Sequence, residues 1–126
     1  MQGKDSAPAE QRERFTRAVR LGSNRNYRYV YRKGKAYPSR DLTLVYLKGR
    51  GVKVGFSVSS KVGNAVIRNR IRRFMREDIR KKIYRMKNGR YIFVARPSAR
   101  EISHEKLTSE LMAVLNRAGL MKEDMQ

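Results

Sequence analysis

Hydrophobic and polar residues alternate strictly over residues 52–59 of this chain. Lysine, glycine and serine separate its four apolar side chains, which are Val52, Val54, Phe56 and Val58. This period of two predicts a strand with one buried face. Residues 41–48 alternate more loosely and carry apolar side chains on both faces, so this strand should be covered on both sides. The short glycine-containing link at 49–51 favours a hairpin between the two strands.

Apolar residues recur at helical spacing in other parts of the chain. The longest predicted helix covers about residues 64–86, and its apolar stripe advances in steps of three, four or one residues. A first helix is predicted over about residues 24–33, where Ser23 or Asn24 can cap its start and Gly34 ends it.

A third strand is predicted over residues 91–95, and a last helix follows Ser103 as its cap. The order helix, strand, strand, helix, strand, helix indicates an α+β fold, a small α-β sandwich with helices against one mixed sheet. Residues 1–19 have little apolar content and are interpreted as a flexible basic arm. Residues 20–121 form the domain, and residues 122–126 form a C-terminal tail.

The amino-acid composition of the chain limits the kinds of molecule that it can be expected to bind. The chain has 126 residues, enough for one domain, and a net charge of +20. Such a surface repels itself unless a polyanion neutralises it. The chain has no cysteine, which fits a reducing compartment, and no apolar run reaches the length of about 18 residues that a membrane span needs. We therefore expect a cytoplasmic domain that binds RNA, DNA or an anionic membrane.

The positive charge is concentrated between residues 61 and 90, which hold twelve basic residues and two acidic ones. A glycine turn that contains Lys61 precedes the long helix, and the first amides and the dipole of a helix favour a phosphate. Arginines follow on the first turns, and a guanidinium can grip two phosphate oxygens at once. The alternative is a solvated basic face on an ordinary amphipathic helix. Glutamate is too rare here for many i,i+4 pairs, which favours the nucleic-acid interpretation.

Residues for catalysis by the protein itself are scarce. The 11 acidic residues are scattered, and the adjacent Glu77 and Asp78 should point to different sides of the long helix. His104 is the one histidine, and its place at a helix start indicates a surface structural role. We predict no catalytic residue and no protein metal ligand, which disfavours a stand-alone nuclease.

The segment from Gly63 to Arg73 reads Gly-Asn-Ala-Val-x-Arg-Asn-Arg-x-x-Arg and resembles the signature of the bacterial ribonuclease P protein. The resemblance extends over about residues 20–121 and includes the segments 54–59 and 91–96 in the same order. It implies a ribosomal-protein-like fold with a left-handed β-α-β crossover through the signature helix. It also implies assembly with a catalytic RNA that cleaves precursor tRNA at its 5′ end with Mg²⁺, which the RNA mainly holds.

The resemblance also assigns roles to residues. The residues expected to bind the catalytic RNA or to lie around that surface are Lys61, Asn64, Arg68, Asn69, Arg70, Arg72, Arg73 and Arg76. The family has two aromatic residues one turn apart that line a cleft for the 5′ leader of the precursor, and Tyr27 and Tyr31 match them. The alternative is that both rings belong to the core.

A further family tyrosine aligns with Val45, whereas Tyr46 lies one residue away on the opposite face, so Tyr46 is a third leader-binding candidate whose register stays open. The expected partners are ribonuclease P RNA and precursor tRNA, with no membrane and no small-molecule substrate. The second interpretation is a structural RNA-binding protein of ribosomal type without a role in cleavage.

Overall fold

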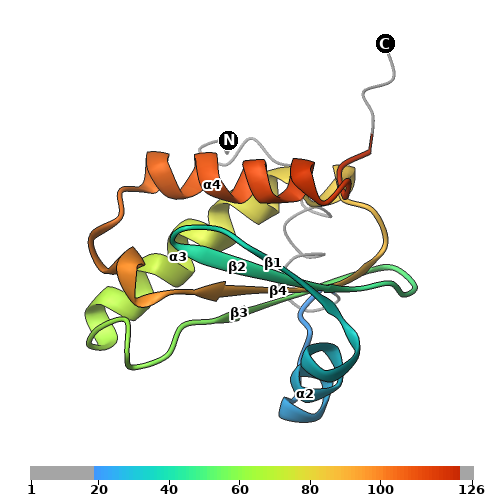
Figure 1. Cartoon of the computed structure of the whole chain (residues 1–126), viewed down its shortest axis with the longest axis horizontal. Helices are drawn as coiled ribbons and strands as arrows, with labels where there is room; N and C mark the ends of the chain where they lie inside the picture. The colour runs from blue at the N-terminus through green and yellow to red at the C-terminus, as the bar shows by residue number, and fades with distance from the viewer. Residues whose placement is uncertain (1–18, 123–126) are drawn as a thin grey trace, which may run out of the picture.

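The computed structural model describes residues 19–122, and Figure 1 shows their arrangement. The predicted arm and tail lie outside this range apart from their inner ends, Val19 and Lys122. Val19 is buried, and its carbonyl accepts a hydrogen bond from the amide of Val54 at 2.7 Å. In chain order, the elements are α2 (Asn24–Lys33), β1 (Lys35–Pro38), β2 (Leu42–Leu47), β3 (Val52–Ser57), α3 (Ala65–Lys82), the 3-10 turn η2 (Ile83–Arg85), β4 (Gly89–Ala95), the 3-10 turn η3 (Pro97–Glu101) and α4 (His104–Arg117).

The four strands form one mixed sheet in the order β1-β2-β4-β3. The predicted hairpin between β2 and β3 is wrong, because β4 lies between them, antiparallel to β2 and parallel to β3. The hairpin in the structure joins β1 to β2. The alternation of residues 35–38 was too short to predict β1, a four-residue edge strand that is mostly exposed and ends in Pro38.

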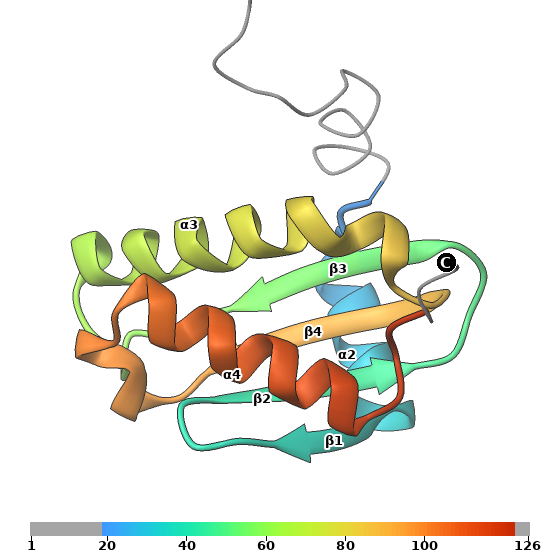
Figure 2. The same cartoon turned by 90° about the horizontal axis from the view of Figure 1, so that it is seen from above.

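The helices cover both faces of this sheet. α3 and α4 lie together on one face, and α2 lies alone on the other (Figure 1). β3 and β4 run in the same direction, with α3 crossing between them on the face toward the viewer in Figure 2. This view shows that the crossover is left-handed, as the family resemblance implied, against the usual right-handed rule.

The alternation along β2 divides its side chains between two cores. Leu42 and Leu44 are fully buried in the main cluster, which α3 and α4 complete. Val45 belongs to a smaller cluster with Val30 of α2 and Ile92 of β4. The expectation that both faces of this strand are covered is therefore confirmed.

Short polar caps set where the helices begin. Ser23 is the N-cap of α2, and the carboxamide oxygen of Asn64 accepts a hydrogen bond from the amide of Ile67 at 3.0 Å at the start of α3. The long helix ends earlier than predicted, since α3 stops at Lys82 and a 3-10 turn follows. Met86 lies beyond that turn, where it is buried and forms a bridge with Met121.

Candidate nucleic-acid interface

The first turns of α3 hold their arginines against the backbone. The Nε of Arg68 donates to the carbonyl of Gly63 at 3.1 Å. Arg72 donates to the carbonyl of Val58 at 3.3 Å and to the side-chain oxygen of Asn69 at 3.2 Å. A guanidinium has five N–H donors, so these contacts orient both side chains and leave donors for an anion. Asn69, which was expected to bind RNA, thus also positions Arg72.

The remaining predicted arginines of α3 point in other directions. Arg70 reaches toward η3 and donates to the carbonyl of Arg100 at 2.7 Å, while its own Nε is buried without a hydrogen-bond partner among residues 19–122. Arg73 and Arg76 are exposed, and the guanidinium of Arg73 lies 5.6 Å from the centre of the Phe74 ring. In the described part of the chain, neither Arg70 nor Arg73 forms an ion pair with a carboxylate. The basic ridge that the sequence predicted is therefore present.

Two other residues of the predicted set lie at the start of this helix. Lys61 is exposed in the turn before α3. Asn64 is also exposed, but its side-chain oxygen serves as the helix cap. The cap uses the amide of Ile67, so one of the amides that could have faced a phosphate is already bound.

A groove runs between α2 and β3, beside the ridge. It has a volume of about 500 Å³, and its wall includes Tyr27 and Tyr31 from α2, Phe56 from β3 and Arg72 from α3. It continues into a hollow of about 600 Å³ that Tyr27, Phe56 and Arg72 also line, together with Arg76. The tertiary structure thus brings two of the predicted aromatic residues next to two of the predicted arginines.

The position of Tyr27 depends on Gly55. The ring of Tyr27 lies over this residue of β3, and a Cβ atom there would approach the ring carbon Cζ to 2.6 Å. Burial raises the pKa of Tyr27, while a hydrogen bond with the Phe56 backbone acts in the opposite direction. Tyr27 is half-buried, whereas Tyr31 is 44% exposed. Tyr27 therefore both packs on the sheet and lines the groove, and Tyr31 keeps a ring face open to a ligand.

Tyr46 lies elsewhere. It packs against the main core on the face of α3 and α4, with its ring 5.0 Å from that of Tyr91, and its hydroxyl donates to the carbonyl of Asn88. Gly89, with φ of +150°, makes room for the Tyr46 ring. Val45 faces α2 but is buried in the smaller core. The register therefore separates Tyr46 from Tyr27 and Tyr31, and Tyr46 lines neither the groove nor the hollow beside it.

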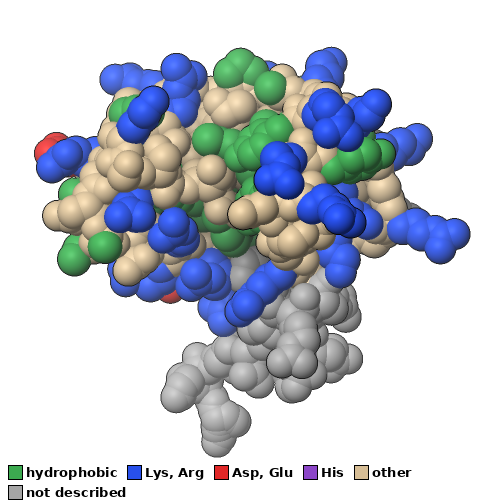
Figure 3. Space-filling model, turned by 90° about the horizontal axis from the view of Figure 1, so that it is seen from below, with side chains coloured by type: hydrophobic (Ala, Val, Ile, Leu, Met, Phe, Trp, Pro, Cys, Tyr) green, Lys and Arg blue, Asp and Glu red, His purple; other side chains and the backbone are tan. Residues whose placement is uncertain are grey.

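Residues that were not predicted as site residues also line the groove. Phe56 of β3 lies in its wall, Arg28 adds an exposed positive charge there, and Arg20 adds one to the neighbouring hollow. The alternation of residues 52–59 predicted Phe56 as a core residue, and the structure confirms this. Its ring packs against the main core, 6.2 Å from the ring centre of Phe93, while its backbone forms a hydrogen bond with Tyr27. Figure 3 views the face that carries α2, where Lys and Arg side chains surround exposed hydrophobic side chains and acidic side chains occur only near the margin.

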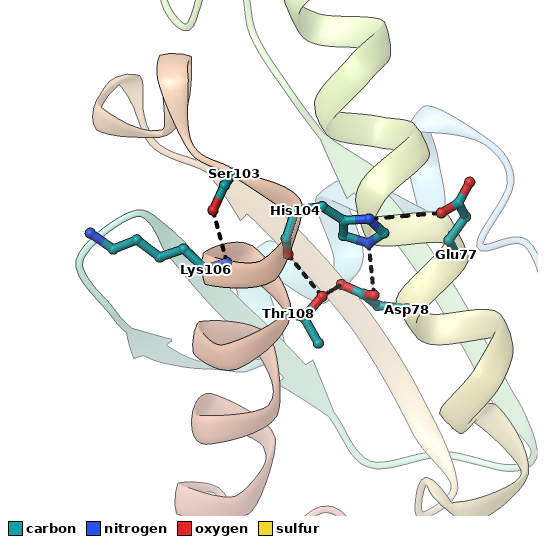
Figure 4. Close-up of polar contacts among 6 residues, drawn as sticks. All are labelled: Glu77, Asp78, Ser103, His104, Lys106 and Thr108. Carbon is teal, nitrogen blue, oxygen red and sulfur yellow. Dashed lines mark hydrogen bonds and ion pairs between the residues drawn. The ribbon is translucent and has the colours of Figure 1, made fainter.

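His104 joins α4 to α3 on the other side of the sheet (Figure 4). Its Nε2 lies 3.0 Å from Oδ1 of Asp78, and its Nδ1 lies 3.9 Å from Oε1 of Glu77. The two acids thus contact different nitrogens of one imidazole, Asp78 from a buried position and Glu77 from a more exposed one. The Thr108 hydroxyl also donates to Asp78, at 2.8 Å. These contacts make the cluster a structural junction, in agreement with the role expected for His104.

Two further properties concern residues 19–122 alone. No helix there combines the length and the apolar content of a bilayer crossing. No group of three or more His, Cys, Asp or Glu side chains there is arranged to hold a metal ion.

Comparisons with known proteins agree on one family. The model of the family Ribonuclease P matches residues 15–119. The ribonuclease P protein component of Finegoldia magna is 37% identical over 108 residues, which cover 84% of this chain and 96% of that protein. The corresponding component of Clostridium botulinum strain Langeland is 38% identical over 105 residues, or 80% of this chain and 95% of that protein.

Solved structures extend this likeness to the fold. A Staphylococcus aureus ribonuclease P protein mutant, described as defective in mRNA degradation activity, superposes with a TM-score of 0.82 at 25% identity, over 91% of this chain and all of that one. The Thermotoga maritima ribonuclease P protein gives a TM-score of 0.71 at 21% identity over 78% of this chain and 96% of that one, a likeness of fold.

Proposed function

Since this chain belongs to the ribonuclease P protein family, we propose that it binds the catalytic RNA through the basic ridge of α3 and the precursor's 5′ leader through the groove between α2 and β3. As the protein subunit of ribonuclease P, it is the accessory component of an endoribonuclease that matures the 5′ end of tRNA. The family assignment decides against the second interpretation, a structural RNA-binding protein without a role in cleavage.

The observation that carries the leader assignment is the juxtaposition of Tyr27, Tyr31 and Arg72 along one groove. Unpaired bases stack on aromatic rings largely without regard to their sequence, and each stacked base contributes about 1–3 kcal/mol. A guanidinium beside the rings can pair with the phosphates of the same strand. A groove of this kind suits leaders of many sequences.

The ridge supplies the second half of the proposal. Arg68 and Arg72 are held by backbone carbonyls, which reduces the entropy that they lose when they bind phosphate. Arg73 and Arg76 project from the same helix as exposed cations. The catalytic RNA would neutralise charges that otherwise repel one another along α3.

In this proposal, the catalytic RNA holds most of the Mg²⁺ that the reaction needs. The metal would supply the nucleophile and stabilise the leaving oxygen in phosphodiester cleavage, and the protein would act by holding the leader. We assign no protein ligand to it. We also place the assembly in the cytoplasm, a proposal supported by the absence of cysteine from the sequence.

A cleavage assay at low Mg²⁺ tests the assignment, with the full chain alone, the catalytic RNA alone and the two together. We expect the protein alone to leave precursor tRNA uncut and the mixture to cleave faster than the RNA. Turnover by the protein without RNA would overturn the accessory role.

A binding assay on the assembled enzyme tests the groove. Tyr27→Ala should weaken the binding of precursor tRNA by about 1–3 kcal/mol, the contribution of one stacked base. The binding of mature tRNA should not change. Tyr46→Phe is the matched control, because it removes a hydroxyl contact on the opposite face of the sheet. Equal losses for precursor and mature tRNA in Tyr27→Ala would assign the ring to the core.

A further inference from the structure

A second pocket lies on the far side of α2 from Tyr31. It has a volume of about 420 Å³ and lies among α2, the end of β2 and the starts of β3 and β4. Among residues 19–122, four basic residues line it and no acidic one does. These four residues are Arg20, Lys48, Lys53 and Arg90. Of these four residues, only Arg20 also belongs to the site described above, because it lines the hollow into which the groove continues.

Local contacts shape this pocket. The guanidinium of Arg90 donates to the carbonyl of Arg50 at 2.6 Å, which holds its side chain against the loop between β2 and β3. One donor is used there, so four N–H groups of Arg90 remain for other partners. Lys48 is exposed at the end of β2. The loop-held Arg90 and the exposed Lys48 thus border the same hollow.

An aromatic side chain forms another part of the wall. Tyr29 of α2 lines the pocket, and this residue is 49% exposed. The guanidinium of Arg32 lies 5.6 Å from the centre of its ring. A tyrosine ring beside several cations is the combination that single-stranded nucleic acid uses, a stacking surface together with partners for phosphates.

The pocket adjoins the groove that contains Tyr27. Arg20 and Leu21 line both this pocket and the neighbouring hollow, which in turn shares Tyr27 and Arg72 with the groove. A strand that leaves the groove past Tyr27 therefore meets Arg20 and then the pocket. The two sites follow one another around the N-terminal part of α2.

We propose that this pocket is a distal subsite for single-stranded leader RNA, in which a base stacks on Tyr29 and the adjoining phosphates pair with Lys48 and Arg90. The inference rests on the proposed function, since it takes the groove at Tyr27 as the proximal site. Continuity with that groove favours the leader over the catalytic RNA as the occupant. The protein would then hold a longer leader at two successive places.

A series of precursor tRNAs with leaders lengthened one nucleotide at a time tests this inference in the assembled enzyme. Wild-type affinity should rise in two steps, first as the leader fills the groove at Tyr27 and then as it reaches the pocket. The double variant Tyr29→Ala, Lys48→Ala should lose only the second step, about tenfold in affinity for long leaders. Both side chains are exposed, so the fold should remain intact.

Lys106→Ala is the matched control, because it removes an exposed charge from α4 on the other face of the sheet. A second step that persists in the double variant would overturn the inference. So would a loss of affinity for the catalytic RNA that does not depend on leader length, since the pocket would then serve that RNA. If Tyr27→Ala leaves leader-dependent binding unchanged, the assignment of the groove as the leader site is wrong. The leader-length series distinguishes this result from a failure of the pocket alone.

Discussion

The imidazole of His104 at the start of α4 meets the buried carboxylate of Asp78 in α3, with Nε2 and Oδ1 3.0 Å apart. The same ring stacks on Phe74, with the ring centres 4.4 Å apart and the planes 5° from parallel. The Thr108 hydroxyl completes the contacts of Asp78 from the next turn of α4. One side chain thus joins the two helices that cover this face of the sheet (Figure 4).

Replacing His104 by alanine should lower the free energy of unfolding by about 1–3 kcal/mol, because Asp78 would lose a hydrogen bond in a buried position. Urea denaturation of the full chain measures this loss. Ser109→Ala, an exposed change on the same helix, should have little effect. An equally small effect of both changes would show that the junction does not stabilise the fold.

Replacing Arg73 by alanine should weaken binding of the catalytic RNA and make it less dependent on salt. If Arg73 contacts one phosphate, the log-log slope of affinity against salt should fall by about 0.7–0.9. Arg73 suits this test better than Arg70, whose bond to the carbonyl of Arg100 ties it to the fold. Binding titrations at several salt concentrations provide the slope, with Lys106→Ala as the control. An unchanged slope for Arg73→Ala would argue against a phosphate contact.

Replacing Gly55 by alanine should mimic the loss of Tyr27, because the added methyl group would occupy the space of the Tyr27 ring. We expect reduced affinity for precursor tRNA, unchanged affinity for mature tRNA and little further loss in the double variant with Tyr27→Ala. A double-mutant cycle on the assembled enzyme measures this coupling. Fully additive losses would show that the two residues act independently.

The carboxyl groups of Asp41 and Glu110 interact where β2 meets α4. Burial, followed by the hydrogen bond to Asp41, raises the pKa of Glu110 above its ordinary 4.5, while the hydrogen bond with Glu110 lowers the pKa of Asp41. A raised pKa in the folded state means that protonated Glu110 stabilises the fold. This contribution is complete below the pKa of the unfolded chain and is lost as the pH rises through the folded value.

The stability advantage of the wild type over Glu110→Gln should therefore shrink as the pH rises from about 4.5 toward neutrality. Urea denaturation across this range at constant ionic strength measures the difference. Glu105→Gln, an exposed change on the same helix, corrects for the general effect of removing an acid. A difference that stays constant with pH would contradict the assigned direction.

Much of the site could be predicted because its parts are local. Caps follow from hydrogen bonds that span three residues, and the structure confirms Ser103 and chooses Ser23 over Asn24 at the start of α2. The arginines of α3 lie on one helix, so their spacing already predicted a basic side. Tyr27 and Tyr31 are also one helical turn apart, and the family resemblance assigned them to the site together.

The sequence by itself determined the helices, three of the four strands and the basic character of α3, since each depends on neighbours within a few residues. Only the tertiary structure decided that β4 inserts between β2 and β3, that Tyr46 turns to the core and that Arg72 of α3 shares a groove with the tyrosines of α2. Alternation specifies which side chains share a face of a strand, but the partner strand is chosen by contacts between residues far apart in the chain.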